Sequence, residues 1–312
     1  MPPAAADGTA IRIAAMGRLP PDGLMRRVGW DVFARNPGDV FEERGALQWQ
    51  LVKSLLPDGW GLEGKRVLDF GCGAGRVLAP AISEDPQAEF WGCDLHAPSV
   101  AWLREHLALG ERAFQTAVWP PIAQPDASFE LIYAFSVFTH LVDSWSAWLL
   151  ELHRMLSDDG LLIVTVFGPG QSAFGEEPVA EASTGMNVLY PSASWDVGGP
   201  LVLHSEWWLR AHWGRAFEIV SLRPGDPGGA PPLFGQGVLV LRKRPGVYTS
   251  EELERPEPAE PREISALRQN VSSLRREIAR HEIVLSSHSW RLTAPLRAAA
   301  QLARNWRAGR RS

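Results

Sequence analysis

The sequence predicts an α/β fold in which helices cover both faces of a seven-stranded, mostly parallel sheet. Short apolar runs of strand length alternate along the chain with segments whose apolar residues recur at helical spacing. Turns rich in Gly, Pro and Asp separate these segments. The composition, with 45% hydrophobic and 21% charged residues, is that of a globular protein. At 312 residues, the chain is long enough for one core domain and an appendage.

The first half of the sheet is predicted from four apolar runs that alternate with helices. A helix over residues 41–56 comes first and ends at the turn Pro57-Asp58-Gly59. Further helices are expected from about Arg76 and over residues 99–109. Because helices connect the strands, parallel pairing with right-handed crossovers follows. The four strands are expected at residues 65–70, 88–94, 114–118 and 129–135.

The second half of the sheet begins with a helix over residues 144–156, for which Asp143 is the expected N-cap. The turn Asp158-Asp159-Gly160 then leads into an apolar run at residues 161–167, which predicts a strand buried on both faces. The remaining elements are expected at residues 205–214 (helix), 217–222 (strand) and 237–243 (a final, antiparallel strand).

Changes in composition divide the chain into five regions. The first is rich in Ala, Pro and Gly and lacks the basic start and apolar core of a signal peptide. The regions are a disordered leader at residues 1–25, the α/β domain at 26–245, a Pro/Glu-rich linker at 246–262, a coiled coil at 263–288 and a basic amphipathic tail at 289–312.

Charge and cysteine content exclude several classes of protein. The net charge of -5 argues against a general nucleic-acid binder, which needs a basic surface. Two cysteines, Cys72 and Cys93, are too few for a disulfide scaffold or a zinc site and fit a reducing compartment. No window reaches ~18 uninterrupted apolar residues, the length of a membrane-spanning helix. The expected localisation is therefore cytoplasmic.

Residues 67–76 read Val-Leu-Asp-Phe-Gly-Cys-Gly-Ala-Gly-Arg and form the central motif. An apolar strand delivers the chain to a turn where three glycines let the backbone approach a ligand closely. Asp69 lies two positions before the first glycine, and Asp94 ends the next strand. A pyrophosphate site would place its third glycine one residue later, and an acid beside the loop suits a cationic ligand better. A purely structural glycine turn is the alternative.

This motif resembles that of the class I S-adenosylmethionine-dependent methyltransferases, and the resemblance covers roughly residues 40–244. Residues 125–132 and 155–160 add matches to the family's later motifs. The resemblance implies a Rossmann-like fold, S-adenosylmethionine as cofactor, and methyl transfer. It implies that Asp69 organises the glycine loop and faces the methionine part, whereas Asp94 binds the ribose hydroxyls. The expected cofactor residues are Asp69, Gly71, Cys72, Gly73, Gly75, Asp94, Leu95, Phe135 and Ser136.

The sequence departs from the family near the end of the third strand. Many relatives carry an Asp there that holds the adenine amino group, whereas this chain has Ala117, Val118 and Trp119. The backbone of Val118 and stacking by Trp119 are the expected substitutes, which adds both residues to the cofactor site.

His140 is the candidate catalytic residue. It follows the fourth strand, and ligands of such sheets bind at the carboxyl edge. An alcohol acceptor needs a general base, and the pKa of histidine lies near neutrality. The alternative is that His140 only braces the following helix. No carboxylate or histidine cluster with metal-ligand spacing is apparent, so metal-independent catalysis is expected.

The stretch from Gly168 to His204 is too long for a plain connector, and loops of that length are usually functional. We expect it to shape the acceptor pocket. Trp195 is suited to stack on a sugar ring, and Asp196 to bind hydroxyl groups. The alternative is that these residues only hold a surface loop together. The candidate substrate-binding residues are Tyr190, Trp195, Asp196 and His204.

Apolar residues after the linker fall on alternating three- and four-residue steps, which predicts a coiled-coil seam of about three heptads. Such a seam would join two copies of the chain into a homodimer. The alternative is a single helix that docks its apolar stripe on its own domain. The seam residues are Ile264, Leu267, Val271, Leu274, Ile278 and Leu285.

The tail is basic and rich in tryptophan. No acidic residue follows Glu282, and arginines accumulate around Trp290 and Trp306. This pattern is typical of a membrane-surface element or a partner-docking helix, with a solvated tail as the alternative.

Residues 286–297 resemble a tail found on bacterial glycosyltransferases and methyltransferases of surface-glycan assembly. This resemblance implies a sugar or glycan acceptor, contact with glycosyltransferases, and a peripheral position at the inner membrane face. The rivals are another acceptor, such as a small-molecule alcohol, an amine or a lipid, and a non-catalytic cofactor-binding scaffold that recruits glycan enzymes.

Overall fold

The computed structural model describes residues 19–26, 37–169, 184–190, 199–225, 233, 235–293, 295 and 297. The chain forms two compact units, which comprise residues 1–266 and 267–312. Among the described residues, none of the helices combines the length and apolar character that crossing a membrane requires.

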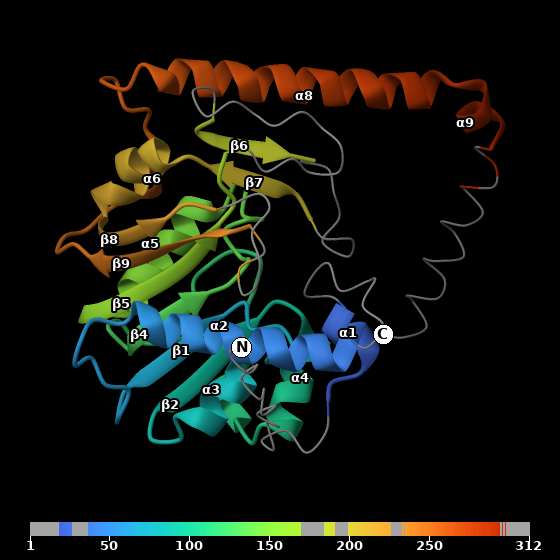
Figure 1. The fold of residues 1–312 in the computed structure, drawn as a ribbon. Coiled ribbons are helices and arrows are strands. Elements are labelled where there is room, and N and C mark those ends of the chain that lie inside the picture. Colours follow the sequence, from blue (N-terminus) through green and yellow to red (C-terminus); the bar gives the residue numbers. More distant parts are fainter. Residues whose placement is uncertain are drawn as a thin grey trace, which may run out of the picture. The chain divides into compact units, whose positions relative to one another are not determined.

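The first unit contains a seven-stranded sheet, which confirms the predicted fold class (Figure 1). The order of the strands is β3-β2-β1-β4-β5-β9-β8. The first five strands in this order pair in parallel, and β9 is antiparallel to both of its neighbours. The bounds are β1 Arg66–Phe70, β2 Glu89–Asp94, β3 Ala113–Gln115, β4 Phe129–Ala134, β5 Leu156–Val166, β8 Phe217–Arg223 and β9 Gly237–Lys243.

Alternate residues of the central strands enter two hydrophobic clusters, one on each face of the sheet. Val67 belongs to one cluster and Leu68 to the other, as the two-residue period of a strand requires. Because both faces are covered, the strands read as continuous apolar runs. One face is covered by α2 (Pro37–Leu55), α3 (Leu78–Glu84) and α4 (Ala97–His106), and the other by α5 (Trp145–Met155) and α6 (Glu206–His212). Single-turn helices lie at Gly110–Arg112 and Trp213–Arg215.

Two local details differ from the expectation. The N-cap of α5 is Ser144 and makes no side-chain cap bond, whereas Asp143 lies exposed outside the helix. Strand β5 starts at Leu156, before the expected turn at residues 158–160. Its pairing with β4 jumps from Phe129↔Leu156 to Leu131↔Leu161, so the turn residues form a bulge within the strand.

The predicted long loop contains a second, two-stranded sheet. Strands β6 (Met186–Leu189) and β7 (Leu201–His204) pair antiparallel. A bridge from Phe167 to Leu203 joins this hairpin to the end of β5. Each strand is only four residues long and stands among glycines, prolines and serines, so its period could not be recognised in the sequence.

The boundaries of the domain differ from those expected. The expected leader includes α1 (Asp22–Arg26), in which Met25 is buried. The expected linker includes α7 (Ser250–Glu254), whose Leu253 is fully buried and whose N-terminus has a capping box formed by Thr249 and Glu252. The compact unit therefore continues to Ala266, well past residue 245.

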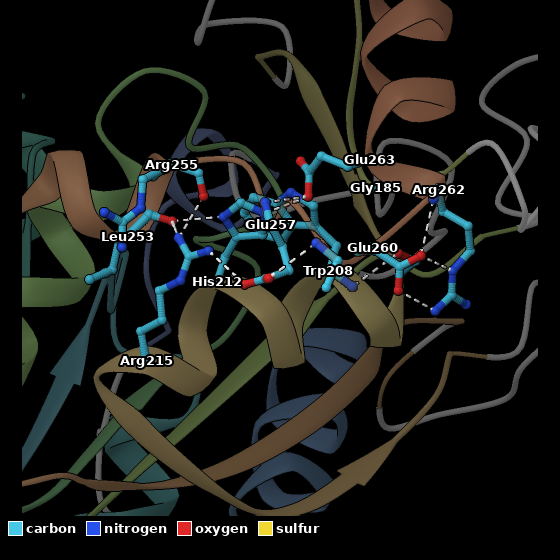
Figure 2. Close-up of polar contacts among 12 residues, drawn as sticks. Gly185, Trp208, His212, Arg215, Leu253, Arg255, Glu257, Glu260, Arg262 and Glu263 are labelled. Atoms are coloured by element: carbon cyan, nitrogen blue, oxygen red, sulfur yellow. Dashed lines mark hydrogen bonds and ion pairs between the residues drawn. The ribbon is translucent and has the colours of Figure 1, made fainter.

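A polar cluster attaches the start of α8 (Arg262–Ser286) to the domain (Figure 2). We call it the clasp. The His212 imidazole lies between the Leu253 carbonyl oxygen, 2.7 Å from Nδ1, and Glu263 Oε2, 3.2 Å from Nε2. Arg215 donates to carbonyl oxygens at the end of α7 at 2.6–3.0 Å and pairs with Glu257 Oε2 at 3.3 Å. The residues of the clasp are His212, Arg215, Leu253, Glu257 and Glu263.

The expected coiled-coil segment forms a continuous 25-residue helix, α8, followed by α9 (His288–Leu292). The six expected seam residues are 46–59% exposed within the single chain. Pairing with a second copy stays a prediction. The guanidinium of Arg297 lies 3.6 Å from the ring centroid of Trp290, and most of the basic tail lies outside the described residues.

Candidate active site

The candidate site lies where the order of the sheet reverses. After β1 the chain winds to β2 and β3 on one side and then crosses to β4 on the other side. The loops after β1 and β4 therefore flank one crevice at the carboxyl edge, the usual ligand position in such sheets. The two loops meet closely, since a Cβ atom on Gly71 would collide with Val137.

The glycine loop folds back against the end of β2. Gly71, Gly73 and Gly75 have φ angles of +79°, +53° and +87°, in the left-handed region that favours glycine. The amides of Gly71 and Cys72 donate to the Cys93 carbonyl oxygen at 2.8 and 3.0 Å. The motif thus needs glycine for its conformation, and the expected cofactor residues of β1 and β2 lie together.

Asp69 is buried beneath this loop with only 3% of its surface exposed. Its Oδ2 atom has no hydrogen-bond partner among the described residues. Burial raises the pKa of Asp69 to about 8. The Tyr133 hydroxyl and the Arg76 guanidinium lower this pKa, and the Asp94 charge raises it further. An unsatisfied buried carboxylate is suited to a positively charged ligand group.

Asp94, at the end of β2, holds the loop in place. Its Oδ2 accepts from the Gly73 amide at 2.9 Å, and its Oδ1 accepts from the His96 amide at 2.8 Å. Each carboxylate oxygen has two lone pairs, so the group retains acceptor capacity for a ligand hydroxyl. The neighbouring Leu95 is 42% exposed.

These residues fit the cofactor that the resemblance implies. S-adenosylmethionine presents a sulfonium and an amino group, which match the unsatisfied Asp69 carboxylate. It also presents a ribose diol, which matches the remaining acceptor capacity of Asp94. The three glycines of the loop carry no side chains of their own, which allows a ligand to approach the backbone there.

The loop after β3 presents the expected adenine substitutes at the surface. Val118 and Trp119 are 63% and 53% exposed. The Val118 carbonyl oxygen accepts a hydrogen bond from Trp148 Nε1 at 3.0 Å, so α5 anchors this loop. The backbone next to the half-exposed Trp119 is therefore held by α5.

Phe135 and Ser136 follow β4 on the opposite side of the crevice. Phe135 is buried, with its ring centroid 6.0 Å from that of Tyr133. Ser136 has a φ of +58°, a strained value for a residue other than glycine. Its amide donates to Thr165 Oγ1 at 2.7 Å, and its hydroxyl bonds to the Gln236 side chain at 2.8 Å. Neighbouring strands thus hold this turn.

His140 lies one turn further along the same loop. Its Nδ1 is 2.8 Å from the Pro200 carbonyl oxygen, just before β7. Burial lowers the pKa of His140. The adjacent Thr139 carbonyl oxygen accepts from the Val202 amide at 2.8 Å. The β6–β7 hairpin and the His140 loop therefore form one connected element.

The expected acceptor residues are not all brought together. Tyr190 ends β6 with a φ of +52° and packs against the small apolar cluster of Phe167, Leu189 and Leu203. Trp195 and Asp196 lie outside the described residues.

The structure corrects the expectation for His204, which is 1% exposed and belongs to the core. Its ring lies 5.5 Å from that of Trp208 and 5.7 Å from that of Trp213. Neither ring nitrogen has a hydrogen-bond partner among the described residues, and burial lowers its pKa to about 3. The side chain is covered because α6 and the single-turn helix that follows it begin soon after β7 and place Trp208 and Trp213 beside His204.

Sequence analysis did not single out three further residues that border the site. They are Tyr133, Thr165 and Gln236. The position of Tyr133 within a strand motif was the only available signal. Its proximity to Asp69 depends on the register between β1 and β4.

Comparison with known proteins places a methyltransferase domain at this site. Residues 68–162 match the family model described as a methyltransferase domain. This segment runs from β1 to β5, and it includes the glycine loop, Asp94 and His140.

Two curated relatives are similar over part of the chain. The malonyl-acyl-carrier-protein O-methyltransferase of Geobacter sulfurreducens is 28% identical over 148 residues, 46% of this chain and 55% of that protein. The ubiquinone biosynthesis O-methyltransferase of Bradyrhizobium diazoefficiens is 33% identical over 121 residues, 36% of this chain and 44% of that protein. The chain thus spans about half the length of the curated relatives that it matches.

Solved structures show weaker likeness. A putative S-adenosylmethionine-dependent methyltransferase from Listeria monocytogenes has a TM-score of 0.47 and 17% identity, and covers 65% of this chain and 99% of its own. The glycopeptide N-methyltransferase MtfA in complex with sinefungin has a TM-score of 0.45 and 15% identity, and covers 65% of this chain and 87% of its own. TM-scores this low carry no information on substrate or mechanism.

The matched segment, the strand order and the glycine loop agree with one another. Residues 68–162 thus match a methyltransferase domain within a Rossmann-like sheet, and the residues of this site fit S-adenosylmethionine as the cofactor.

Proposed function

We propose that the chain transfers a methyl group from S-adenosylmethionine to a hydroxyl group of a sugar or glycan intermediate. The match of residues 68–162 to a methyltransferase domain supports the class of reaction. The glycine loop and its two carboxylates, Asp69 and Asp94, support the cofactor. The names of both curated relatives say O-methyltransferase, which supports an oxygen acceptor.

The observation that carries the proposal is the hydrogen bond of His140. When Nδ1 donates to the Pro200 carbonyl oxygen, at 2.8 Å, a neutral imidazole bears its lone pair on Nε2. Because burial lowers the pKa of His140, the neutral form predominates at neutral pH. The Pro200 bond also orients the ring. His140 is thus held in the tautomer that can accept a proton at Nε2.

The bound cofactor supplies an electrophilic methyl group on a positively charged sulfur. Asp94 orients the ribose, and Asp69 faces the cationic end. His140 Nε2 takes the proton of the acceptor hydroxyl as the oxygen–carbon bond forms and the sulfur–carbon bond breaks. The electron pair stays on sulfur. Such an in-line displacement depends mainly on the positioning of the two reactants.

The sugar class of the acceptor is supported by the sequence of residues 286–297, which resembles the tail of bacterial surface-glycan enzymes. Tyr190, Trp195 and Asp196 are the residues that we propose for acceptor binding. An aromatic ring covers the apolar face of a sugar, and a carboxylate accepts from its hydroxyls. The basic tail would bring the enzyme to an anionic membrane surface or to glycosyltransferases.

The exposed stripe of α8 supports a homodimer as the working form of the protein. Its seam residues are each at least 46% exposed in the single chain. Light scattering should report a dimer for the full chain and a monomer for Leu274→Lys, because a lysine at a seam position disfavours pairing. Ser272→Lys, on the opposite face of the same helix, is the matched control and should remain dimeric.

The test of the catalytic role is His140→Ala. We expect cofactor affinity to be unchanged and turnover to fall by about 10²–10⁴-fold, the usual contribution of a general base. Near-normal turnover in this variant would refute the role of His140. The acceptor screen should include sugar nucleotides, lipid-linked sugars and oligosaccharides beside simple alcohols and fatty-acyl esters. Methylation of simple alcohols or fatty-acyl esters alone would refute the glycan acceptor but would still support methyltransferase activity.

A further inference from the structure

We propose that Tyr133 is a positioning residue of the cofactor site. Its phenol stabilises the ionised form of Asp69, which is the form that binds a positively charged cofactor. Binding of S-adenosylmethionine is then linked to the release of a proton from Asp69. The inference rests on the proposed function, because it assigns a residue and a regulation to that same site.

The first observation is the register between β1 and β4. Asp69 and Tyr133 are paired residues on these adjacent parallel strands, so their side chains lie on the same face of the sheet. Both are buried, with exposures of 3% and 0%. The pair lies directly beneath the glycine loop.

The second observation is that the two groups complement one another. The Tyr133 hydroxyl and Asp69 Oδ2 are both buried and have no hydrogen-bond partner among the described residues. Their proximity affects the pKa values of both groups, but they do not meet the geometry of a hydrogen bond. A phenol can donate and a carboxylate can accept, so a small rotation would satisfy both. Leaving two such groups unpaired in the interior is costly.

The third observation is that two aromatic rings flank the side chain of Tyr133 and restrict its orientation. Its ring centroid lies 6.0 Å from that of Trp49 on α2 and 6.0 Å from that of Phe135. Gly45 of the same helix comes so close to the Arg76 backbone that a Cβ atom there would collide with the Arg76 carbonyl oxygen. Helix α2 therefore packs against both the Tyr133 ring and the Arg76 backbone, next to Asp69.

Several groups face Asp69 and set its charge. Arg76, which follows the loop, favours the carboxylate, whereas Asp94 on β2 disfavours it. The Cys72 and Cys93 thiols are buried nearby, and burial raises the pKa of each. Burial of Asp69 itself dominates, so the acid is protonated at neutral pH before the cofactor binds. A positively charged ligand favours the carboxylate, the proton leaves to solvent, and the Tyr133 O–H group then donates to the new charge.

The experiment is calorimetry of the full chain with S-adenosylmethionine between pH 6 and pH 9.5, in two buffers of different ionisation heat. The parent should release about one proton per cofactor bound at pH 7, and its affinity should rise by about tenfold per pH unit below pH 8. Tyr133→Phe should bind about tenfold more weakly at pH 7, a shift of about one pKa unit, and this gap should close by pH 9.5. Tyr248→Phe is the matched control and should behave as the parent, because its phenol bonds to Pro245 outside the site.

The outcomes separate this inference from the proposed function. A parent that does not bind the cofactor overturns both. A parent that binds without releasing a proton overturns only the inference, as does a Tyr133→Phe variant whose affinity is unchanged or is reduced equally at every pH.

If Tyr133→Phe does not fold, fluorine NMR of the parent labelled with 3-fluorotyrosine decides instead. The chain has three tyrosines, so Tyr190→Phe and Tyr248→Phe assign the spectrum. The Tyr133 resonance should shift on cofactor binding, with the same pH midpoint as the affinity. A resonance that does not respond to the cofactor overturns the inference.

Discussion

Two polar clusters in the first unit differ in how completely their groups are paired. In the clasp, both nitrogens of His212 face acceptors, and Arg215 contacts several carbonyl oxygens (Figure 2). Beneath the glycine loop, by contrast, Asp69 and Tyr133 each retain a buried polar atom without a partner among the described residues. The groups of the clasp are paired within the chain, whereas the site under the loop leaves two polar atoms unpaired among the described residues.

This difference in pairing indicates different roles for the two clusters. A paired cluster fixes geometry, because the loss of His212 or Glu263 would leave the other one buried without its partner. A partly paired cluster at a ligand site is held in place by the surrounding fold and is ready to interact with charge that arrives from outside. The clasp therefore fixes the first turn of α8 within the first unit, and we propose that the Asp69 cluster sets the affinity for the cofactor.

The largest expected effect comes from breaking the clasp. Glu263→Ala should lower the free energy of unfolding by about 3 kcal/mol, because it leaves the buried His212 without its carboxylate partner. Cofactor affinity should not change, since the clasp is separate from the glycine loop. Chemical denaturation and cofactor titration measure the two effects. Glu218→Ala, which breaks an exposed pair with Arg242, is the control and should change stability little.

The second expected effect is on cofactor binding. Asp69→Asn keeps the shape of the side chain but removes the charge, so we expect affinity for S-adenosylmethionine to fall by about a hundredfold, equivalent to about 2.7 kcal/mol. Calorimetry measures this change. Equal affinity in variant and parent would mean that Asp69 does not face the cationic part of the cofactor.

The same variant tests the protonation of Asp69 through stability. The pKa of Asp69 is raised to about 8 in the folded chain. The stability that protonated Asp69 contributes is therefore fully present at acidic pH and is lost as the pH rises toward 8. Asn does not titrate. In thermal unfolding without cofactor, the melting temperature of Asp69→Asn relative to that of the parent should therefore rise between pH 5 and pH 8. A difference between the two that stays constant over this range would contradict the raised pKa.

The smallest expected effect concerns α7, whose Leu253 belongs to the clasp. Thr249→Ala removes the capping box of α7 and should cost about 1 kcal/mol of unfolding free energy. Cofactor affinity should remain that of the parent. Ser250→Ala, one position further along, is the control, since Thr249 and Glu252 form the box without it. Equal losses in the two variants would show that the cap contributes nothing specific.

The sequence by itself determined the elements whose pattern is local. Strand–helix alternation from residue 65 to residue 167, the glycine loop and the final strand were predictable, because apolar period, glycine spacing and turn residues act over a few positions. The cofactor followed from the same local signals, namely Asp69 and Asp94 at fixed places relative to the glycines.

Only the tertiary structure decided what depends on pairing between distant segments. The pairing of Phe167 with Leu203 joins the β6–β7 hairpin to the end of β5, and α6 buries His204, which its sequence context had suggested for the acceptor pocket. Helix α7 and the first turn of α8 join the domain through His212 and Arg215, although their composition is that of a linker. The contact of Tyr133 with Asp69 likewise follows from strand register. Register and burial are properties of the whole fold, so no local pattern encodes them.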